Sequence, residues 1–116
     1  MEYNYLGNTG IKVSKLAFGT LTISPLQRNL KLRESLKVFK KAIDLGVNFF
    51  DTADGYVNYE HLNNLLKVVD RKDIVISSKT YAYNKSQAKN DLNKALMEIG
   101  TDYIDIFMLH EQMNEM

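Results

Sequence analysis

The stretch GVNFFDTADGY, residues 46–56, contains the pattern that decides the fold of this chain. Within it an apolar run, residues 47–50, is followed at once by the carboxylate of Asp51. Lys79 and His110 follow two later apolar runs in the same way. Short apolar runs predict buried strands, and parallel strands bring their carboxyl ends to one edge of a sheet. The pattern therefore predicts a parallel sheet with three titratable side chains at one edge.

Strand and helix signals alternate along the rest of the chain. Strands are predicted to begin near residues 16, 47, 74 and 103, so the successive spacings are 31, 27 and 29 residues by subtraction. Amphipathic patterns between these strands predict three helices, over about 33–45, 60–69 and 86–99. This alternation, with a repeat of about 30 residues, indicates right-handed βαβ units.

Two observations favour a (β/α) barrel over an open doubly wound sheet. The residues after the first predicted strand, Gly19-Thr20-Leu21, lack the glycine-rich phosphate-binding fingerprint. The polar residues also stand at strand ends, where barrel enzymes keep their chemistry. A turn-forming GNTG at residues 7–10, flanked by apolar segments, predicts a hairpin before the first βα unit.

The predicted fold class is therefore α/β: an N-terminal β-hairpin plus about four βα units of a (β/α)8 TIM barrel, that is, a truncated barrel. A complete barrel has eight units and about 250 residues, whereas this chain has 116 residues. We expect residues 1–116 to form a single partial barrel domain and the chain to be a fragment of a longer polypeptide. Its open strand edges predict self-association or a complementing C-terminal half as partner.

Composition excludes several classes of function. Fifteen basic and fourteen acidic residues are scattered along the chain, so we expect neither a nucleic acid nor a membrane as partner. Cysteine is absent, which excludes disulfides and thiolate metal sites, and no metal site is predicted. The N-terminus has no apolar signal region, and no run approaches the ~18 apolar residues of a membrane span. A cytoplasmic location is expected.

The residues at the strand ends form a plausible acid–base site. Asp51 follows an apolar strand, so its carboxylate is expected to be partly buried and to need a cation, for which Lys79 is the candidate. A lysine ammonium beside a tyrosine hydroxyl favours the tyrosinate, so Tyr56 on the following loop is a candidate general acid. His110 is a candidate for orienting a substrate oxygen.

Each of these residues also has a structural interpretation. Asp51 could cap its own loop, Lys79 could be solvated, and Tyr56 is one of seven tyrosines that usually serve packing. A lone histidine such as His110 is more often structural, and His61 is interpreted as a surface or packing residue. The convergence of three titratable groups and a loop tyrosine on one edge favours the catalytic interpretation.

Four segments in the right order resemble the aldo-keto reductase family: residues 6–20, 46–56, 75–80 and 101–110. The resemblance implies a (β/α)8 barrel that uses NADPH, or less often NADH, to reduce an aldehyde or ketone to an alcohol. A small-molecule carbonyl compound is thus the expected substrate.

The resemblance also implies roles for individual residues. Tyr56 is the expected proton donor, Lys79 activates it, Asp51 supports Lys79, and His110 positions the carbonyl group. Gly19 and Thr20, together with Asp51, are the expected cofactor contacts. The segments LTISPLQ at 21–27 and HEQ at 110–112 resemble a bacterial subgroup whose longer members carry an iron–sulfur tail.

Two departures from the family pattern bear on activity. Valine follows the catalytic tyrosine where the family usually has glycine, and Val57 resists positive φ, which predicts a displaced loop. The family's loops for the cofactor phosphates come after later strands, so the isolated chain is predicted to be inactive. The alternatives are a non-catalytic interaction module derived from the family, or a barrel lyase or isomerase using Lys79 as a Schiff base.

Overall fold

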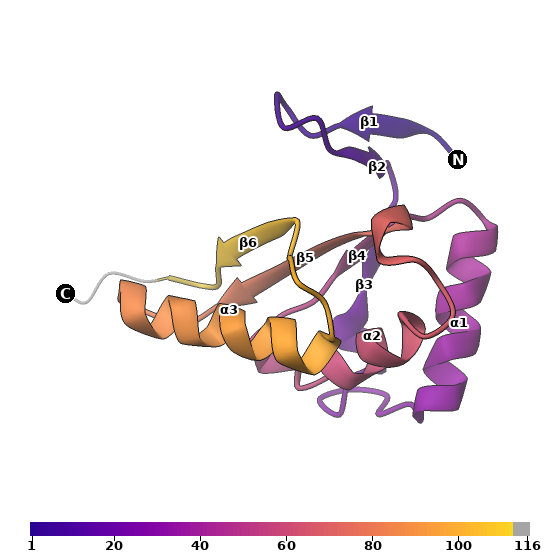
Figure 1. The fold of residues 1–116 in the computed structure, drawn as a ribbon. Coiled ribbons are helices and arrows are strands. Elements are labelled where there is room, and N and C mark those ends of the chain that lie inside the picture. Colours follow the sequence, from indigo (N-terminus) through magenta and orange to yellow (C-terminus); the bar gives the residue numbers. More distant parts are fainter. Residues whose placement is uncertain (113–116) are drawn as a thin grey trace.

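The computed structural model describes residues 1–112 as a short hairpin and a parallel α/β sheet (Figure 1). The hairpin pairs β1 (Tyr3–Tyr5) with β2 (Lys12–Ser14) in antiparallel fashion. The sheet has the order β3-β4-β5-β6, and its strands are β3 (Phe18–Gly19), β4 (Phe49–Asp51), β5 (Val75–Thr80) and β6 (Ile106–Leu109). All three pairings in this sheet are parallel, as the sequence predicted.

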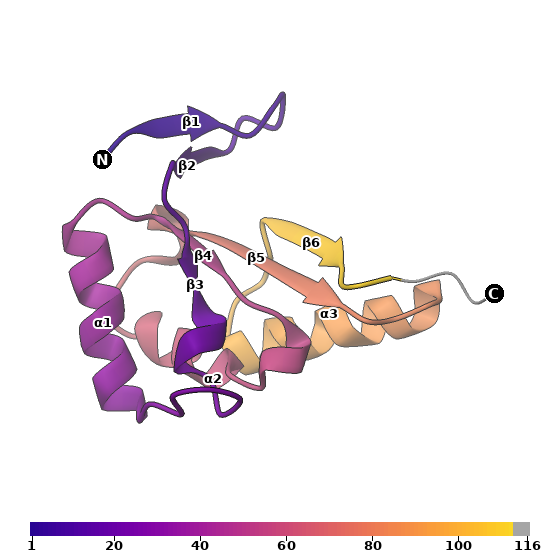
Figure 2. The ribbon, with the colours of Figure 1, turned by 180° about the vertical axis from the view of Figure 1, so that it is seen from behind.

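Three α-helices cover one face of the sheet (Figures 1 and 2). They are α1 (Leu32–Asp44), α2 (Tyr59–Leu65) and α3 (Lys85–Ile99). Short 3-10 segments follow or precede strands: η1 (Thr20–Ile23), η2 (Asp54–Tyr56) and η3 (Arg71–Asp73). The predicted hairpin, the four strands and the three helices are all present.

The second helix ends earlier than the sequence predicted. It was expected over 60–69, but α2 ends at Leu65 and Leu66 caps it. Beyond Leu66 the backbone tightens, because Val68 N donates to Leu65 O at 3.0 Å rather than to a carbonyl four residues back. The turn redirects the chain toward η3 and β5. The tertiary structure therefore ends the helix earlier than the spacing of leucine and valine predicts.

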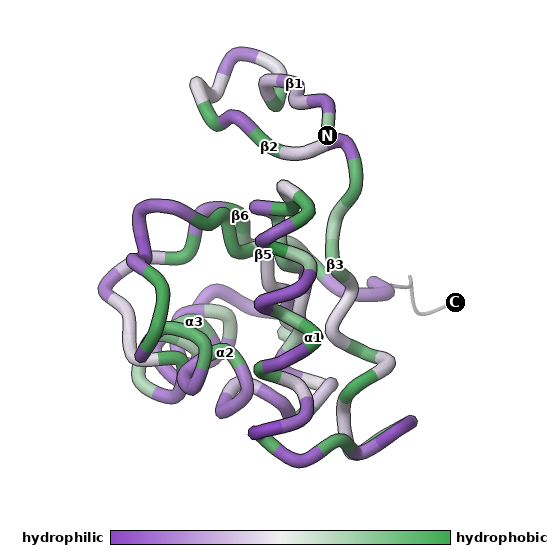
Figure 3. The backbone as a smooth tube through the Cα atoms, turned by 90° about the vertical axis from the view of Figure 1, so that its right-hand side faces the viewer, coloured by the Kyte–Doolittle hydropathy of each residue, from purple (hydrophilic) through white to green (hydrophobic). Residues whose placement is uncertain are grey.

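The core lies between the sheet and the helices. Along α1 hydrophilic and hydrophobic residues alternate, as an amphipathic helix requires (Figure 3). Phe39 of α1 meets Phe50 of β4 and Phe18 of β3, with ring centroids 5.6 and 5.0 Å from its own. Phe39 and Phe50 are fully buried. At about 25 cal/mol per Å² of buried apolar area, each ring stabilises the folded state by several kcal/mol.

The hairpin is fixed to the chain just before β4. Tyr3 donates from its hydroxyl to Gly46 O at 2.6 Å, and the Asn48 side chain bonds Ser14 N and Lys12 O at 2.7 and 3.0 Å. Gly46 has φ 97°, and a Cβ there would lie 2.8 Å from Met1 Cβ. The hairpin therefore occupies the end of the sheet opposite the carboxyl ends of the strands.

Strand register decides which residues can meet at the carboxyl edge. Asp51 lies opposite Gly19 on one side and Ser77 on the other, and Lys79 lies opposite Met108. Within residues 1–112, β3 and β6 each pair with a single strand, so the sheet has two open edges.

Among the helices described, none is long and apolar enough to cross a membrane.

His61 lies in the interface between α1 and α2, not on the surface. The residue is 4% exposed, and Nδ1 lies 2.6 Å from Ser35 Oγ, a contact that agrees with the packing interpretation. Burial lowers the pKa of His61 from its ordinary value of 6.5. The unfolded chain therefore binds a proton at this residue at a higher pH than the folded chain does.

We expect this difference to make folding stability fall as the pH drops below about 6.5 toward the lower folded-state value. The loss attributable to His61 is at most about 1.4 kcal/mol per pH unit. Urea unfolding at pH 7.5 and 5.5 measures it, and His61→Gln should reduce the difference between the two pH values. His110→Gln removes the other histidine and is the matched control; an unchanged pH dependence in His61→Gln would contradict the assignment.

Candidate active site

An ion pair joins neighbouring strands at the carboxyl edge of the sheet. Lys79 Nζ donates to both carboxylate oxygens of Asp51 at 2.8 Å and to Thr52 O at 2.7 Å. Ser77 Oγ donates to Asp51 Oδ1 at 2.7 Å. The side chains of Lys79 and Asp51 are 14% and 28% exposed, so the pair is only partly screened by water. The register thus produces the predicted contact between these two residues.

This arrangement bears on the Schiff-base alternative. A Schiff base requires a neutral amine with its lone pair directed at a carbonyl carbon. Here Lys79 Nζ donates to three oxygen atoms, as an ammonium does. The geometry therefore favours an electrostatic role for Lys79 over a nucleophilic one.

Tyr56 reaches the same place from η2, directly after β4. Its hydroxyl lies 3.5 Å from Lys79 Nζ, and Nζ is 5.0 Å from the centroid of the tyrosine ring. The ring of His110 meets the Tyr56 ring edge to face, with centroids 5.9 Å apart. The structure therefore brings together all four side chains that the sequence proposed as catalytic.

Tyr59, only three residues further on, has a different environment. It belongs to α2, is buried, and its hydroxyl lies 2.7 Å from Ser78 Oγ on the helix-facing side of β5. Burial raises the pKa of Tyr59 to about 12. Of these two tyrosines, therefore, only Tyr56 combines access to the carboxyl edge with a neighbouring cation.

His110 follows β6 and is held by backbone and ring contacts. Its amide donates to Thr80 O at 2.8 Å, and its imidazole stacks on Tyr81 with centroids 4.4 Å apart and an interplanar angle of 15°. Among the described residues, Nδ1 is buried and has no hydrogen-bond partner. A buried imidazole nitrogen without a partner is unusual in a folded protein and marks His110 as a candidate functional residue.

Tyr81 is a site residue that the sequence analysis missed. Besides stacking on His110, it lies against Gly55, where an added Cβ would come within 2.8 Å of Tyr81 Cε2. It therefore touches both the loop that carries Tyr56 and the histidine. Its place two residues after Lys79, on the same side of an extended chain, was the available signal.

The loop carrying Tyr56 is anchored on both sides. Asp54 accepts from Lys94 Nζ of α3 at 2.7 Å, and this hydrogen bond raises the pKa of Lys94. On the other side, buried Asn58 accepts from Thr52 Oγ1 at 2.9 Å and donates to Thr20 O at 2.8 Å. The sequence analysis predicted none of these anchors, because each joins segments at least six residues apart.

Val57 lies between these anchors in the left-handed conformation, with φ 55° and ψ 41°. A β-branched residue seldom adopts positive φ and pays for it in steric strain. The residue is 66% exposed, so packing compensates for little of that strain. The loop nevertheless places Tyr56 beside Lys79, because the anchors at Asp54 and Asn58 determine its path.

The residues predicted to contact a cofactor lie at the same edge. Gly19 pairs with Asp51, and a Cβ at Gly19 would meet no atom within 4 Å, so the space above it is open. Thr20 is buried, and its Oγ1 has no hydrogen-bond partner among the described residues. The open space at Gly19 can accommodate a ligand at this edge, whereas the Thr20 hydroxyl lies beneath the surface. No cluster of three or more potential metal ligands occurs within residues 1–112.

Comparison with known proteins bears on the origin of this arrangement. The sequence model of the Aldo/keto reductase family matches residues 15–114. The chain belongs to the aldo/keto reductase family. Its members are oxidoreductases that generally use NADPH or NADH, so the predicted resemblance is confirmed at the level of the family.

Curated relatives extend well beyond the region they share with this aldo/keto reductase chain. It is 28% identical to L-galactose dehydrogenase of Arabidopsis thaliana, over 96% of the chain and 38% of the relative. It is 30% identical to a probable voltage-gated potassium channel subunit beta of the same plant, over 95% of the chain and 37% of the relative. The chain thus spans about two fifths of these relatives.

Solved aldo-keto reductases share the fold over the same portion. A putative aldo-keto reductase from Pseudomonas aeruginosa superposes with a TM-score of 0.84 at 29% identity, covering 95% of this chain and 46% of that one. A thermostable aldo-keto reductase in complex with the inhibitor epalrestat also gives 0.84, at 28% identity and 95% and 43% coverage. The predicted fold, part of a TIM barrel, is confirmed.

The strain at Val57 generates a stability prediction. Val57→Gly should stabilise the chain by about 1 kcal/mol relative to Val57→Ala, because glycine adopts positive φ without steric cost whereas alanine does not. The urea midpoint of each variant measures the difference. Val38→Gly and Val38→Ala form the matched control pair at an exposed position of helix α1, where glycine should be the less stable by a similar amount. Equal stability of the two Val57 variants would show that the loop is not strained.

Proposed function

We propose that this chain carries the acid–base residues of an aldo-keto reductase that reduces a small aldehyde or ketone to an alcohol. One observation carries the proposal: Lys79 Nζ is bound by Asp51 and Thr52 O and lies 3.5 Å from the hydroxyl of Tyr56. A phenol beside an ammonium is suited to giving its proton to a carbonyl oxygen. The reaction class follows from this pair together with the family.

Each residue has a distinct task in this proposal. The Tyr56 hydroxyl protonates the carbonyl oxygen, and Lys79 stabilises the negative charge that then develops on the tyrosine oxygen. Asp51 holds Lys79 in position through both carboxylate oxygens. His110 directs the carbonyl group toward Tyr56, with its ring orientation set by Tyr81.

The cofactor part of the proposal rests on the carboxyl edge. NADPH or NADH, when bound, supplies the hydride that reduces the carbonyl carbon. Gly19, Thr20 and Asp51 are the residues of this chain proposed to hold it, because Gly19 leaves open space beside Asp51 and Thr20 directly follows Gly19. The activity belongs to the complete protein, which we place in the cytoplasm.

Cofactor binding to the isolated chain tests whether residues 1–116 form a complete cofactor site. We expect no saturable binding of NADPH at micromolar concentration, because affinity for a dinucleotide requires more contacts than one sheet edge offers. Titration of the purified chain, followed by cofactor fluorescence and thermal shift, measures this. Saturable binding would mean that residues 1–116 already form a working cofactor site.

A protein that contains this chain and turns over an aldehyde permits the direct test of the acid. Tyr56→Phe should lower kcat by about 10²–10⁴ while NADPH affinity stays the same, because only the proton donor is lost. Tyr83→Phe removes the hydroxyl of an exposed tyrosine on another loop and is the matched control. Full activity in Tyr56→Phe would exclude the proposed role.

A second candidate is a non-catalytic interaction module. Relatives named probable or putative voltage-gated potassium channel subunit beta occur in two plants and in Schizosaccharomyces pombe, at 27–30% identity. The open edge strand β6 also exposes Met108 and Leu109, at 42% and 67%. Association through this edge, with a second copy or a complementing C-terminal half, is the form that this function would take.

Solution mass tests association through β6. We expect the purified chain to self-associate with increasing concentration, and Leu109→Lys to weaken this by placing a charge on the open edge. Size-exclusion chromatography with light scattering measures the mass. Val68→Lys changes a similarly exposed valine just after α2 and is the matched control. A stable monomer at all concentrations would rule out self-association.

A further inference from the structure

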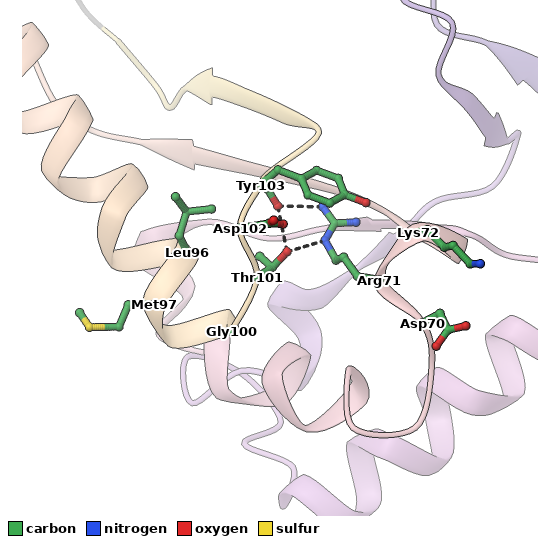
Figure 4. Close-up of a pocket in the computed structure, with 9 residues that line it drawn as sticks. All are labelled: Asp70, Arg71, Lys72, Leu96, Met97, Gly100, Thr101, Asp102 and Tyr103. Atoms are coloured by element: carbon green, nitrogen blue, oxygen red, sulfur yellow. Dashed lines mark hydrogen bonds between the residues drawn. The ribbon is translucent and has the colours of Figure 1, made fainter.

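A single arginine connects the beginning of β5 with the segment that leads into β6. From η3, Arg71 donates through Nε to Thr101 Oγ1 at 3.0 Å and through Nη1 to Ile74 O at 2.9 Å. Its Nη2 donates to Tyr103 O at 3.0 Å and to Asp105 Oδ2 at 2.7 Å. The guanidinium also lies 4.0 Å from the centroid of the Tyr103 ring, which Figure 4 shows beside it.

This arginine lines an open hollow of about 840 Å³, to which Lys72 also contributes (Figure 4). Asp70 and Asp102 line the hollow as well as the two basic residues, so its charges balance. The contacts of Arg71 also argue against an anion site. All three of its side-chain nitrogens donate to protein oxygens, and its side chain is only 14% exposed. Arg71 therefore has a structural role, which depends on the protein groups that it binds.

Asp105 is the residue that Arg71 holds most closely, and it stands directly before β6. Its Oδ2 accepts from Arg71 and also from the amide of Ile76 at 2.8 Å. Its own amide donates to Ile76 O at 3.1 Å. Side chain and backbone of Asp105 thus both attach to Ile76 of β5, which favours the observed register of β6.

The register of β6 has a consequence at its far end. Within the described residues β6 pairs only with β5, so nothing on its other edge restrains it. A slip by one residue would turn every β6 side chain to the opposite face. His110, which follows the strand, would then lose the bond from its amide to Thr80 O and the stack on Tyr81.

We propose that Asp105, oriented by Arg71, is a positioning residue for His110. It acts through the register of β6, from the end of the strand opposite the acid–base residues. The relevance to carbonyl reduction rests on the proposed function, but the positioning itself concerns only the folded chain. A test that uses neither cofactor nor substrate therefore separates the two.

The two histidines of the chain make this measurable by NMR. The imidazole of His110 lies over the face of Tyr81, so its ring protons should be displaced upfield, whereas His61 lies apart between α1 and α2. Asp105→Ala and Arg71→Met should abolish the upfield displacement of His110 and leave the signals of His61 in place. The His110 amide should also exchange with solvent faster, on the order of tenfold or more.

Asp105→Asn is the conservative variant, because an amide oxygen still accepts from Ile76 N; it should retain the His110 signal. Ile43→Ala on α1 is the control for general destabilisation, since this residue packs on the core away from β6. If Asp105→Ala fails to fold, Arg71→Lys replaces it in the same NMR comparison. This variant keeps the positive charge but loses the several donors of the guanidinium. The proposal is overturned if the displacement of His110 persists without Asp105 or Arg71, or if Ile43→Ala removes it equally.

Discussion

The ion pair between Asp51 and Lys79 is the interaction on which the arrangement of the site depends. It joins the carboxyl ends of two parallel strands, with both carboxylate oxygens and Thr52 O accepting from one ammonium. A partly buried charge left without its partner would be costly, so the two side chains hold each other in position. The ammonium of Lys79 is thus fixed in position, and Tyr56 and His110 lie around it.

The loop that carries Tyr56 shows how a strained conformation is maintained. Val57 takes a left-handed conformation that glycine would adopt more easily, yet Tyr56 still reaches Lys79. Hydrogen bonds on either side fix the path of the loop. Asp54 binds Lys94 of α3, and Asn58 binds Thr20 and Thr52. Strain of this kind persists where the surrounding structure over-determines the backbone, which is common near functional sites.

The two ends of the sheet serve different purposes. At one end, the hairpin attaches through Gly46 and Asn48, and Arg71 binds Asp105. At the other end lie the acid–base residues and the two buried polar atoms without partners within residues 1–112, Thr20 Oγ1 and His110 Nδ1. Barrel folds commonly divide stability and chemistry between their ends in this way. The Arg71–Asp105 contact links the two, since β6 runs from one end to the other.

The sequence by itself determined the order and type of the elements and the residues at the strand ends. Apolar period and turn residues are local, so Asp51, Lys79 and His110 could be predicted from where each strand stops. The early end of α2, the contact of Tyr81 with His110 and the anchors of Asn58 and Arg71 were decided only by the tertiary structure. Each of these depends on which distant segment lies alongside. Alternation along the strand places Tyr81 on the same side as Lys79, but it does not predict the contact with His110.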